Sequence, residues 1–136
     1  MFTLTSRSPA AATTTFLAVI AALAFAAAAG AATIRGSSNG LVATMQVGTH
    51  HPTVGRNWPM KFTATRGGRA AKVTVTYEYL FGGRVVAVRA HHTFSGHFSD
   101  ALLFPANAVG EPLTFRAAIK AGSTSINLDY PIQVVR

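Results

Sequence analysis

The chain of 136 residues contains no cysteine and only 4 acidic residues, against 12 lysines and arginines. The absence of cysteine excludes disulfide scaffolds, cysteine-based zinc sites, iron–sulfur clusters and thiol nucleophiles. Charged residues make up only 12% of the sequence and hydrophobic residues 49%, a balance that argues against an intrinsically disordered chain. The length is that of one ordinary domain.

The first thirty residues have the layout of a secretory signal peptide. Arg7 is the only charged residue before the apolar run FLAVIAALAFAAAA at 16–29, and small residues follow that run. A basic start, a short apolar core and an alanine-rich exit are typical of exported proteins. We therefore expect residues 1–32 to be a signal peptide with a helical core, and the mature protein to be secreted or extracytoplasmic. The alternative is an uncleaved membrane anchor through residues 16–32, although a spanning helix usually needs about 20 apolar residues.

After the signal region, a polar stretch at 33–40 (TIRGSSNG) is expected to be a flexible linker, and residues 41–136 to be the folded domain. In this domain apolar and polar residues alternate with the period of two that half-buried strands produce. Turn residues rich in glycine and proline separate the alternating runs. Seven strands are predicted, at about 41–48, 58–66, 71–81, 84–91, 97–104, 112–121 and 124–135.

Seven short strands in about a hundred residues predict an all-β fold, namely an immunoglobulin-like sandwich of two antiparallel sheets. Pro131 lies inside the last run, which places that strand at a sheet edge or marks a bulge. Ten aromatic residues in or beside the strands are expected to supply much of the core: Trp58, Phe62, Tyr77, Tyr79, Phe81, Phe94, Phe98, Phe104, Phe115 and Tyr130.

The pair Gly82-Gly83 separates two strand runs and predicts a type I′ hairpin, because both central positions of that turn need positive φ. This turn sets Tyr79 opposite Val86 and Tyr77 opposite Val88, so that the apolar residues of both strands share one face. On the solvent face the same register pairs Glu78 with Ala87 and Thr76 with Arg89. A slip of one residue would reverse the two faces.

The segment HPTVGRNWPM at 51–60 leads into a predicted strand and resembles the opening of YtkA-like domains. Those are small exported immunoglobulin-like modules of bacteria whose first loop carries a Pro-x-x-Gly-x-Asn pattern. The segments 94–100 and 108–116 are similar to parts of uncharacterised secreted proteins from high-GC Gram-positive bacteria. The resemblance covers residues 41–135. Because its motifs are turn and strand residues, it implies the fold and carries no catalytic residues across.

Five histidines are the candidates for metal chemistry: His50, His51, His91, His92 and His97. Imidazole is a common ligand of copper and zinc. If the loops that carry the two adjacent pairs meet at one end of the sandwich, one histidine of each pair converges with His97 on a three-histidine site. The alternative is that the five side chains are solvated, or bonded to backbone carbonyls at the edge of the core, and that the protein holds no cofactor.

A catalytic site is not expected. His97, Ser99 and Asp100 are the residue types of a nucleophilic triad. Residues this close on one strand do not usually place the histidine between the serine and the carboxylate, however. The chain also has no Gly-x-Ser-x-Gly elbow. We therefore predict neither enzyme activity nor a small-molecule substrate.

The net positive charge of the chain indicates which kinds of binding partner are plausible. Without residues 1–32 the chain loses only Arg7, so 11 basic and 4 acidic residues leave a formal charge of +7. The basic residues are spread along the sequence and the aromatic ones are expected to point inward, which disfavours nucleic-acid binding. The charge indicates either an undirected solvated surface or attraction to anionic wall polymers or lipid head groups.

Two functions are consistent with these features. The leading one is an exported, non-catalytic binding or structural module that contacts a component of the cell envelope or a protein partner. The alternative is an extracytoplasmic copper- or zinc-binding module that uses the five histidines named above.

Overall fold

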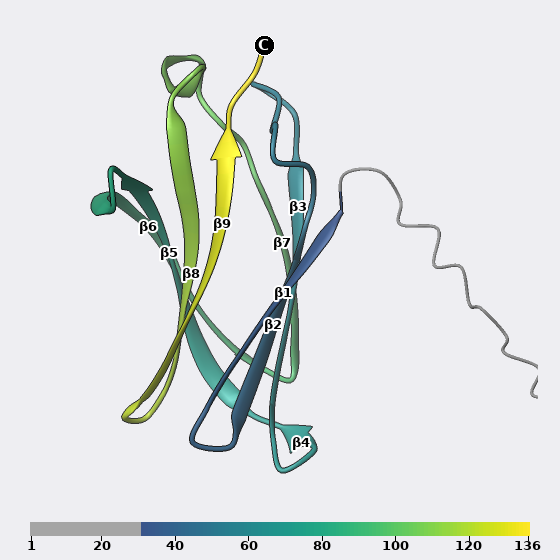
Figure 1. The fold of residues 1–136 in the computed structure, drawn as a ribbon. Helices are drawn as coiled ribbons and strands as arrows, with labels where there is room; N and C mark the ends of the chain where they lie inside the picture. Colours follow the sequence, from purple (N-terminus) through teal and green to yellow (C-terminus); the bar gives the residue numbers. More distant parts are fainter. Residues whose placement is uncertain (1–30) are drawn as a thin grey trace, which may run out of the picture.

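The computed structural model describes residues 31–136, so the signal peptide and the anchor expected near the N-terminus lie almost entirely outside the described residues. Two antiparallel sheets pack face to face, as Figure 1 shows edge-on. The prediction of an all-β sandwich is confirmed. In the part of the chain that is described, no helix is long and apolar enough to cross a membrane.

The first sheet contains β1 (Ala32–Ser38), β2 (Leu41–Val47), β3 (Trp58–Arg66), β4 (Arg69–Ala70) and β7 (His97–Leu102). In this sheet β2 lies between β1 and β3, and both β4 and β7 pair with β3. The second sheet has the order β6 (Arg84–Ser95), β5 (Lys72–Phe81), β8 (Pro112–Ala121) and β9 (Thr124–Gln133). A short 3-10 helix, η1 (Ala106–Ala108), connects β7 to β8.

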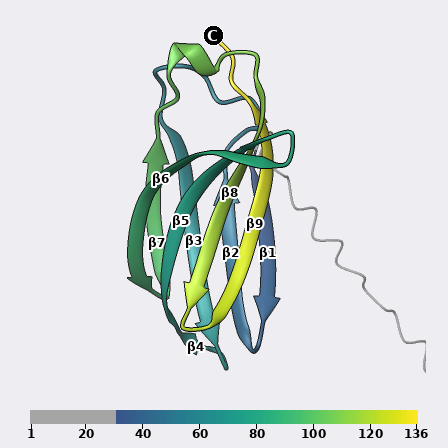
Figure 2. The same ribbon diagram turned by 90° about the vertical axis from the view of Figure 1, so that its left-hand side faces the viewer.

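The chain crosses from one sheet to the other between β4 and β5, between β6 and β7, and between β7 and β8. The pairs β3–β7 and β5–β8 therefore join strands that are not consecutive, as in immunoglobulin-like sandwiches. Figure 2 shows β6 and β7 along one side of the sandwich and β9 and β1 along the other. The two long sides of the molecule are thus formed by different strand pairs.

Seven strands agree with the predicted runs to within two residues at each end, except that β6 continues to Ser95. The alternation of side chains explains the agreement. In β9, for example, even-numbered residues from 124 to 132 are buried and odd-numbered ones are exposed. Pro131 lies on an edge strand, as predicted, because β9 pairs only with β8.

The segment expected to be a flexible linker is instead a strand, and this expectation was wrong. β1 pairs with β2 along its whole length. Asn39 and Gly40, with φ of 48° and 78°, form the two-residue turn that connects the two strands. Gly36 faces β9, where a Cβ atom on it would lie only 2.5 Å from Cγ2 of Ile126. The glycine therefore lets β1 close one side of the sandwich against β9.

Aromatic rings fill the core, and Phe115 is central among them. Its side chain is fully buried, and its ring centroid lies 5.3, 5.4 and 5.7 Å from those of Trp58, Tyr77 and Tyr79. Eight of the ten aromatic residues predicted for the core are buried. The exceptions are Phe98, which is half-buried, and Phe81, which is 47% exposed near the hairpin.

The hairpin between β5 and β6 has the predicted turn but not the predicted register. Gly82 and Gly83 have φ of 56° and 77°, as a type I′ turn requires. On β6, however, Val86 and Ala90 have no partner on β5, so each is the extra residue of a β-bulge. Ala90 has a φ of 48°, a left-handed conformation that a residue with a Cβ rarely adopts.

The two bulges change which residues of β6 face inward. Ala87 and Arg89 occupy the positions opposite Tyr79 and Tyr77 that were predicted for two valines. The valines at 86 and 88 are instead 58% and 62% exposed. Edge strands commonly carry bulges, and a bulge re-aims the side chains beside it. The inward face of β6 is consequently smaller and more polar than the sequence pattern indicated.

Candidate functional site

The five histidines do not converge, because the two pairs lie at opposite edges of the second sheet. His50 donates a hydrogen bond through Nδ1 to the carbonyl of Pro131 on β9, at 2.6 Å, and its ring stacks on Tyr130 with 4.1 Å between centroids. His51 follows it in the same loop and is exposed. The second pair lies on β6. Three strand spacings separate β6 from β9, which amounts to roughly 14 Å.

The members of the second pair also point apart. His91 and Thr76 share a hydrogen bond of 3.0 Å between Nδ1 and Oγ1, whereas His92 turns toward β7, with Nε2 3.5 Å from Oδ2 of Asp100. His97 is exposed on β7. Within residues 31–136, no three histidine, aspartate or glutamate side chains lie close enough to hold a metal ion. The two histidine pairs and His97 are therefore not brought together into the three-histidine copper or zinc site that depended on the loops meeting. His50 bonds to a backbone carbonyl, as in the alternative.

The three residues with the side-chain types of a nucleophilic triad are also separated, because successive side chains of β7 point to opposite faces of the sheet. His97 and Ser99 are exposed and, with Lys61, line a shallow depression on the outer face of the first sheet. Asp100 points the other way, toward the core. The three side chains consequently cannot form a hydrogen-bonded chain.

Asp100 instead links the two sheets at the side where β6 and β7 are the edge strands. Its Oδ2 accepts a 2.9 Å hydrogen bond from the hydroxyl of Tyr77 on β5 and lies beside His92 on β6. Its Oδ1 accepts a 2.8 Å hydrogen bond from the N–H of Ala101. Burial, together with the Asp100 carboxylate, raises the pKa of Tyr77 well above its usual range. The sequence contained a signal for this role, because the period of two places Asp100 on the same face as Phe98.

The bond between Tyr77 and Asp100 gives a prediction about stability. Tyr77→Phe removes a donor from a partly buried carboxylate, and hydrogen bonds to charged groups contribute about 1.5–3 kcal/mol. We expect the free energy of unfolding, measured by urea denaturation, to fall by that amount. Tyr79→Phe is the matched control, because no hydrogen bond is formed by the Tyr79 hydroxyl within the described residues. Equal losses in the two variants would show that the contact with Asp100 contributes nothing.

An apolar groove of about 370 Å³, here called the edge groove, opens at the same side of the sandwich. The bulge at Val86 makes room for the groove, because it places the small Ala87 in the inward position predicted for a valine. Within the described residues Arg89, at the groove, forms no ion pair. The groove is lined by Tyr79, Val86, Ala87, Arg89, Leu102, Leu103, Phe104, Pro105, Asn107, Ala108, Glu111 and Leu113.

Tyr79 in this groove gives a prediction about pH. Burial raises the pKa of Tyr79 from 10.0 to about 12, although the positive charge of Arg89 acts in the opposite direction. Between these pH values the folded protein still holds a proton that the unfolded chain has released, so the free energy of unfolding falls as pH rises. We expect urea denaturation at pH 10, 11 and 12 to show this loss, and Tyr79→Phe to reduce it. A stability that is constant over this range would contradict the burial of the hydroxyl.

Four exposed cationic side chains gather at one end of the sandwich, here called the basic end: Arg66, Arg69, Lys72 and Lys120. Three hairpin turns form this end, at 39–40, 67–68 and 122–123, and Figure 1 shows them together at the bottom. Arg66 and Arg69 are direct partners across the turn between β3 and β4. Arg66 also donates a 3.4 Å hydrogen bond to Oγ1 of Thr124 in the opposite sheet.

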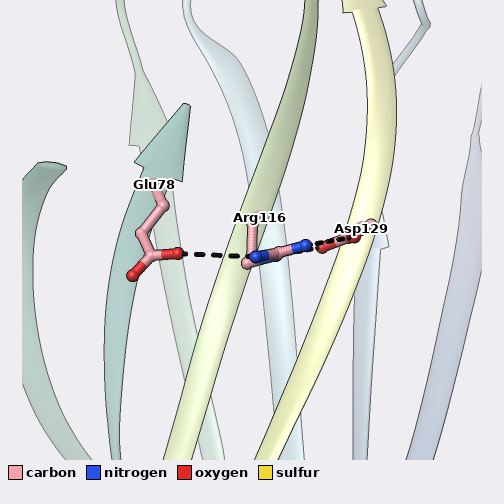
Figure 3. A network of polar contacts seen from close by, with 3 residues as sticks. All are labelled: Glu78, Arg116 and Asp129. Carbon is pink, nitrogen blue, oxygen red and sulfur yellow. Dashed lines mark hydrogen bonds and ion pairs between the residues drawn. The ribbon is translucent and has the colours of Figure 1, made fainter. Parts of the chain in front are cut away.

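The acidic residues of the described chain lie elsewhere. Glu78 and Asp129 flank Arg116 on the outer face of the second sheet, where the guanidinium bonds both Asp129 oxygens at 2.7 and 2.9 Å and lies 4.0 Å from Glu78 (Figure 3). Asp100 bonds Tyr77, as described above. The fourth, Glu111, lines the edge groove.

The basic end is therefore far from any neutralising carboxylate of the described chain. Lys120 pairs with Ser125, and Asp129 lies four residues of extended strand, or roughly 13 Å, beyond that pair. This exceeds the Debye length of about 8 Å at physiological ionic strength. Arg66, Arg69 and Lys72 are close in the sequence, and the pairing of β5 with β8 adds Lys120 to them, so these four charges lie together although the basic residues are spread along the sequence.

Comparisons with known proteins add no relative. No family model matches the sequence, and neither a curated protein nor a solved structure is significantly similar to it. The basic end and the edge groove are the two surfaces of the described chain that could bind a ligand.

Proposed function

We propose that the protein is an exported, non-catalytic immunoglobulin-like module that binds a polyanionic component of the cell envelope through the basic end. The gathering of four exposed cations without a nearby carboxylate carries this proposal. The N-terminal layout of a signal peptide and the resemblance to YtkA-like domains support export. The ligand is a polymer or surface with repeated phosphate or carboxylate groups.

The residue types at the basic end suit such a ligand. The guanidinium group is planar and can bond two oxygens of one phosphate or carboxylate, whereas a lysine ammonium acts as a point charge. Arg66 and Arg69 lie side by side as antiparallel partners. Lys72 and Lys120 lie near each other on neighbouring strands, since Lys120 is opposite Thr74. A chain of regularly spaced anions can contact all four groups at once, which strengthens binding without any deep pocket.

The direction of β1 affects which anionic ligand the basic end can reach. The strand starts at Ala32, opposite Val47, and ends at Ser38, beside the turns of the basic end. Its seven residues span roughly 20 Å, so the chain enters the domain at the end away from the four cations. A protein retained in the membrane through residues 16–32 would thus direct the basic end toward wall polymers. A protein released by cleavage could reach either wall polymers or lipid head groups.

Binding to two polyanions tests the proposal. The exported protein is titrated with poly(glycerol phosphate) in solution and with vesicles of phosphatidylglycerol, and vesicles of phosphatidylcholine serve as the neutral control. We expect saturable binding to at least one anionic probe, weakened as salt is raised, and none to the neutral vesicles. Tighter binding to the polymer would identify wall polymers as the ligand, and tighter binding to the anionic vesicles would identify lipid head groups. Binding to neither anionic probe at low salt contradicts the proposal.

A further inference from the structure

We propose that the edge groove binds an amphiphile, consisting of one apolar chain that ends in a carboxylate, with the carboxylate held by Arg89. This site is independent of the basic end and lies on a different part of the molecule. The groove has the size and the apolar character of small-molecule sites, which usually combine an apolar lining with a few polar groups.

The walls of the groove fit an apolar chain. Tyr79 of β5 lines the groove, and Leu102 and Phe104 line it from the end of β7 and the segment that follows. Leu113 of β8 and Ala108 of η1 continue the apolar lining. Val86 and Leu103 line the same groove and are 58% and 63% exposed, so a chain bound there would remove both from water. Burial of apolar surface is therefore available as a driving force.

The polar groups fit a carboxylate at one end of this chain. Arg89 lies opposite Tyr77 on the inward side of β6, and its positive charge acts on the neighbouring Tyr79 hydroxyl. The guanidinium of Arg89 and the hydroxyl of Tyr79 can both donate hydrogen bonds to a carboxylate. Within residues 31–136 neither group has an acidic partner in ion-pair or hydrogen-bond contact.

Glu111 sets the direction of the ligand. Phe115 is opposite Tyr79, and Glu111 precedes Phe115 by four residues, whereas Arg89 lies two residues beyond Tyr79 in the other direction. The backbones of Arg89 and Glu111 are thus separated by about six residues along the strand direction, or roughly 20 Å, and the two charges mark opposite ends of the groove. A carboxylate is attracted to the Arg89 end and repelled from the Glu111 end, so the apolar tail extends toward η1.

The bulges of β6 favour this ligand over an added peptide strand. Strand addition needs regularly spaced backbone donors and acceptors along an edge. The extra residues Val86 and Ala90 interrupt that spacing in the part of β6 that borders the groove. The extra residue Val86 places Arg89 opposite Tyr77 on the inward face, whereas the unbulged register would place it opposite Thr76 on the outer face. Ala90, the next residue, is the second bulge and has a left-handed φ. Unfavourable backbone conformations of this kind cluster at ligand sites.

Dodecanoate is the probe for the test, used below its micellar concentration and measured by titration calorimetry with the exported protein. We expect saturable binding of one molecule per chain. Dodecanol has the same tail without the carboxylate, and acetate has the carboxylate without the tail. Both are expected to bind at least about tenfold more weakly than dodecanoate. Absence of saturable dodecanoate binding, or equal binding of dodecanol, overturns the proposal.

Three variants locate the site. Arg89→Gln removes the proposed partner of the carboxylate, and Ala87→Leu fills the groove, so each is expected to weaken dodecanoate binding at least about tenfold. Arg84→Gln removes the same charge from the same strand outside the groove lining and is expected to change the affinity less than about twofold. Circular dichroism confirms that each variant is folded. The assignment is overturned if Arg84→Gln weakens binding as much as Arg89→Gln does, or if a folded Ala87→Leu protein binds dodecanoate fully. It is also overturned if the protein is a dimer that Ala87→Leu dissociates, because a second chain would then occupy the groove.

Discussion

Phe115→Ala is expected to lower the free energy of unfolding by about 3–5 kcal/mol, the range measured for truncation of buried phenylalanine. The ring of Phe115 is fully buried and touches aromatic rings from both sheets, namely Trp58 of β3 and the tyrosines of β5. Its removal leaves a cavity that these rigid rings cannot easily fill. Because small domains have only about 5–15 kcal/mol of stability in total, this loss is a large part of it.

Urea denaturation, followed by circular dichroism and by the fluorescence of Trp58, measures the effect. Phe81→Ala is the matched control, since the same atoms are removed from a side chain that is 47% exposed. We expect that variant to lose less than about 1.5 kcal/mol, because much of its ring is already in contact with water. If the two variants lost similar amounts, the core would not be centred on Phe115.

Gly36→Val is expected to destabilise the protein by about 1–3 kcal/mol and to release β1 from the side of β9. A Cβ atom at this position lies 2.5 Å from Cγ2 of Ile126 and 3.1 Å from Cδ2 of Leu128, so a branched side chain cannot be accommodated without movement of one strand. The edge strand β1 is the one free to move, because it pairs only with β2.

Amide hydrogen exchange distinguishes this local release from general destabilisation. We expect the N–H groups of β1, and those of β2 that bond to it, to exchange faster in Gly36→Val, while β5 and β8 change less. Ser37→Val is the control, because Ser37 is exposed on the other face of the same strand. A Gly36→Val protein with unchanged exchange in β1 would contradict the close packing of β1 on β9.

The fold could be predicted where one physical signal dominates. Alternation of apolar and polar residues determined seven strands, and the Gly82-Gly83 pair determined the hairpin turn. β1 was not predicted, although Asn39-Gly40 is a strong hairpin signal, because a polar stretch that contains Gly36 is typical of a linker as well as of a strand packed closely against its neighbour. The register of β6 could not be predicted, since no residue type marks a bulge at Val86.

The candidate sites were harder to predict because they depend on which strands become neighbours. Two histidine pairs and His97 are consistent with a metal site until the sheet order places the pairs at opposite edges. Three of the four cations of the basic end lie within residues 66–72, and only the pairing of β5 with β8 brings Lys120 beside them. The edge groove depends on the bulges in the same way, so it could not be inferred from composition or periodicity.

A comparison of two variants with equal net charge tests the central proposal, that the basic end and not the overall charge binds the envelope polyanion. The first variant carries Arg66→Gln, Arg69→Gln and Lys72→Gln. The second carries Arg56→Gln, Arg84→Gln and Arg136→Gln, outside the basic end. Affinity for poly(glycerol phosphate) is expected to fall at least about tenfold in the first variant and less than about threefold in the second. Equal losses in the two variants would contradict the proposal, because net charge alone would then account for binding.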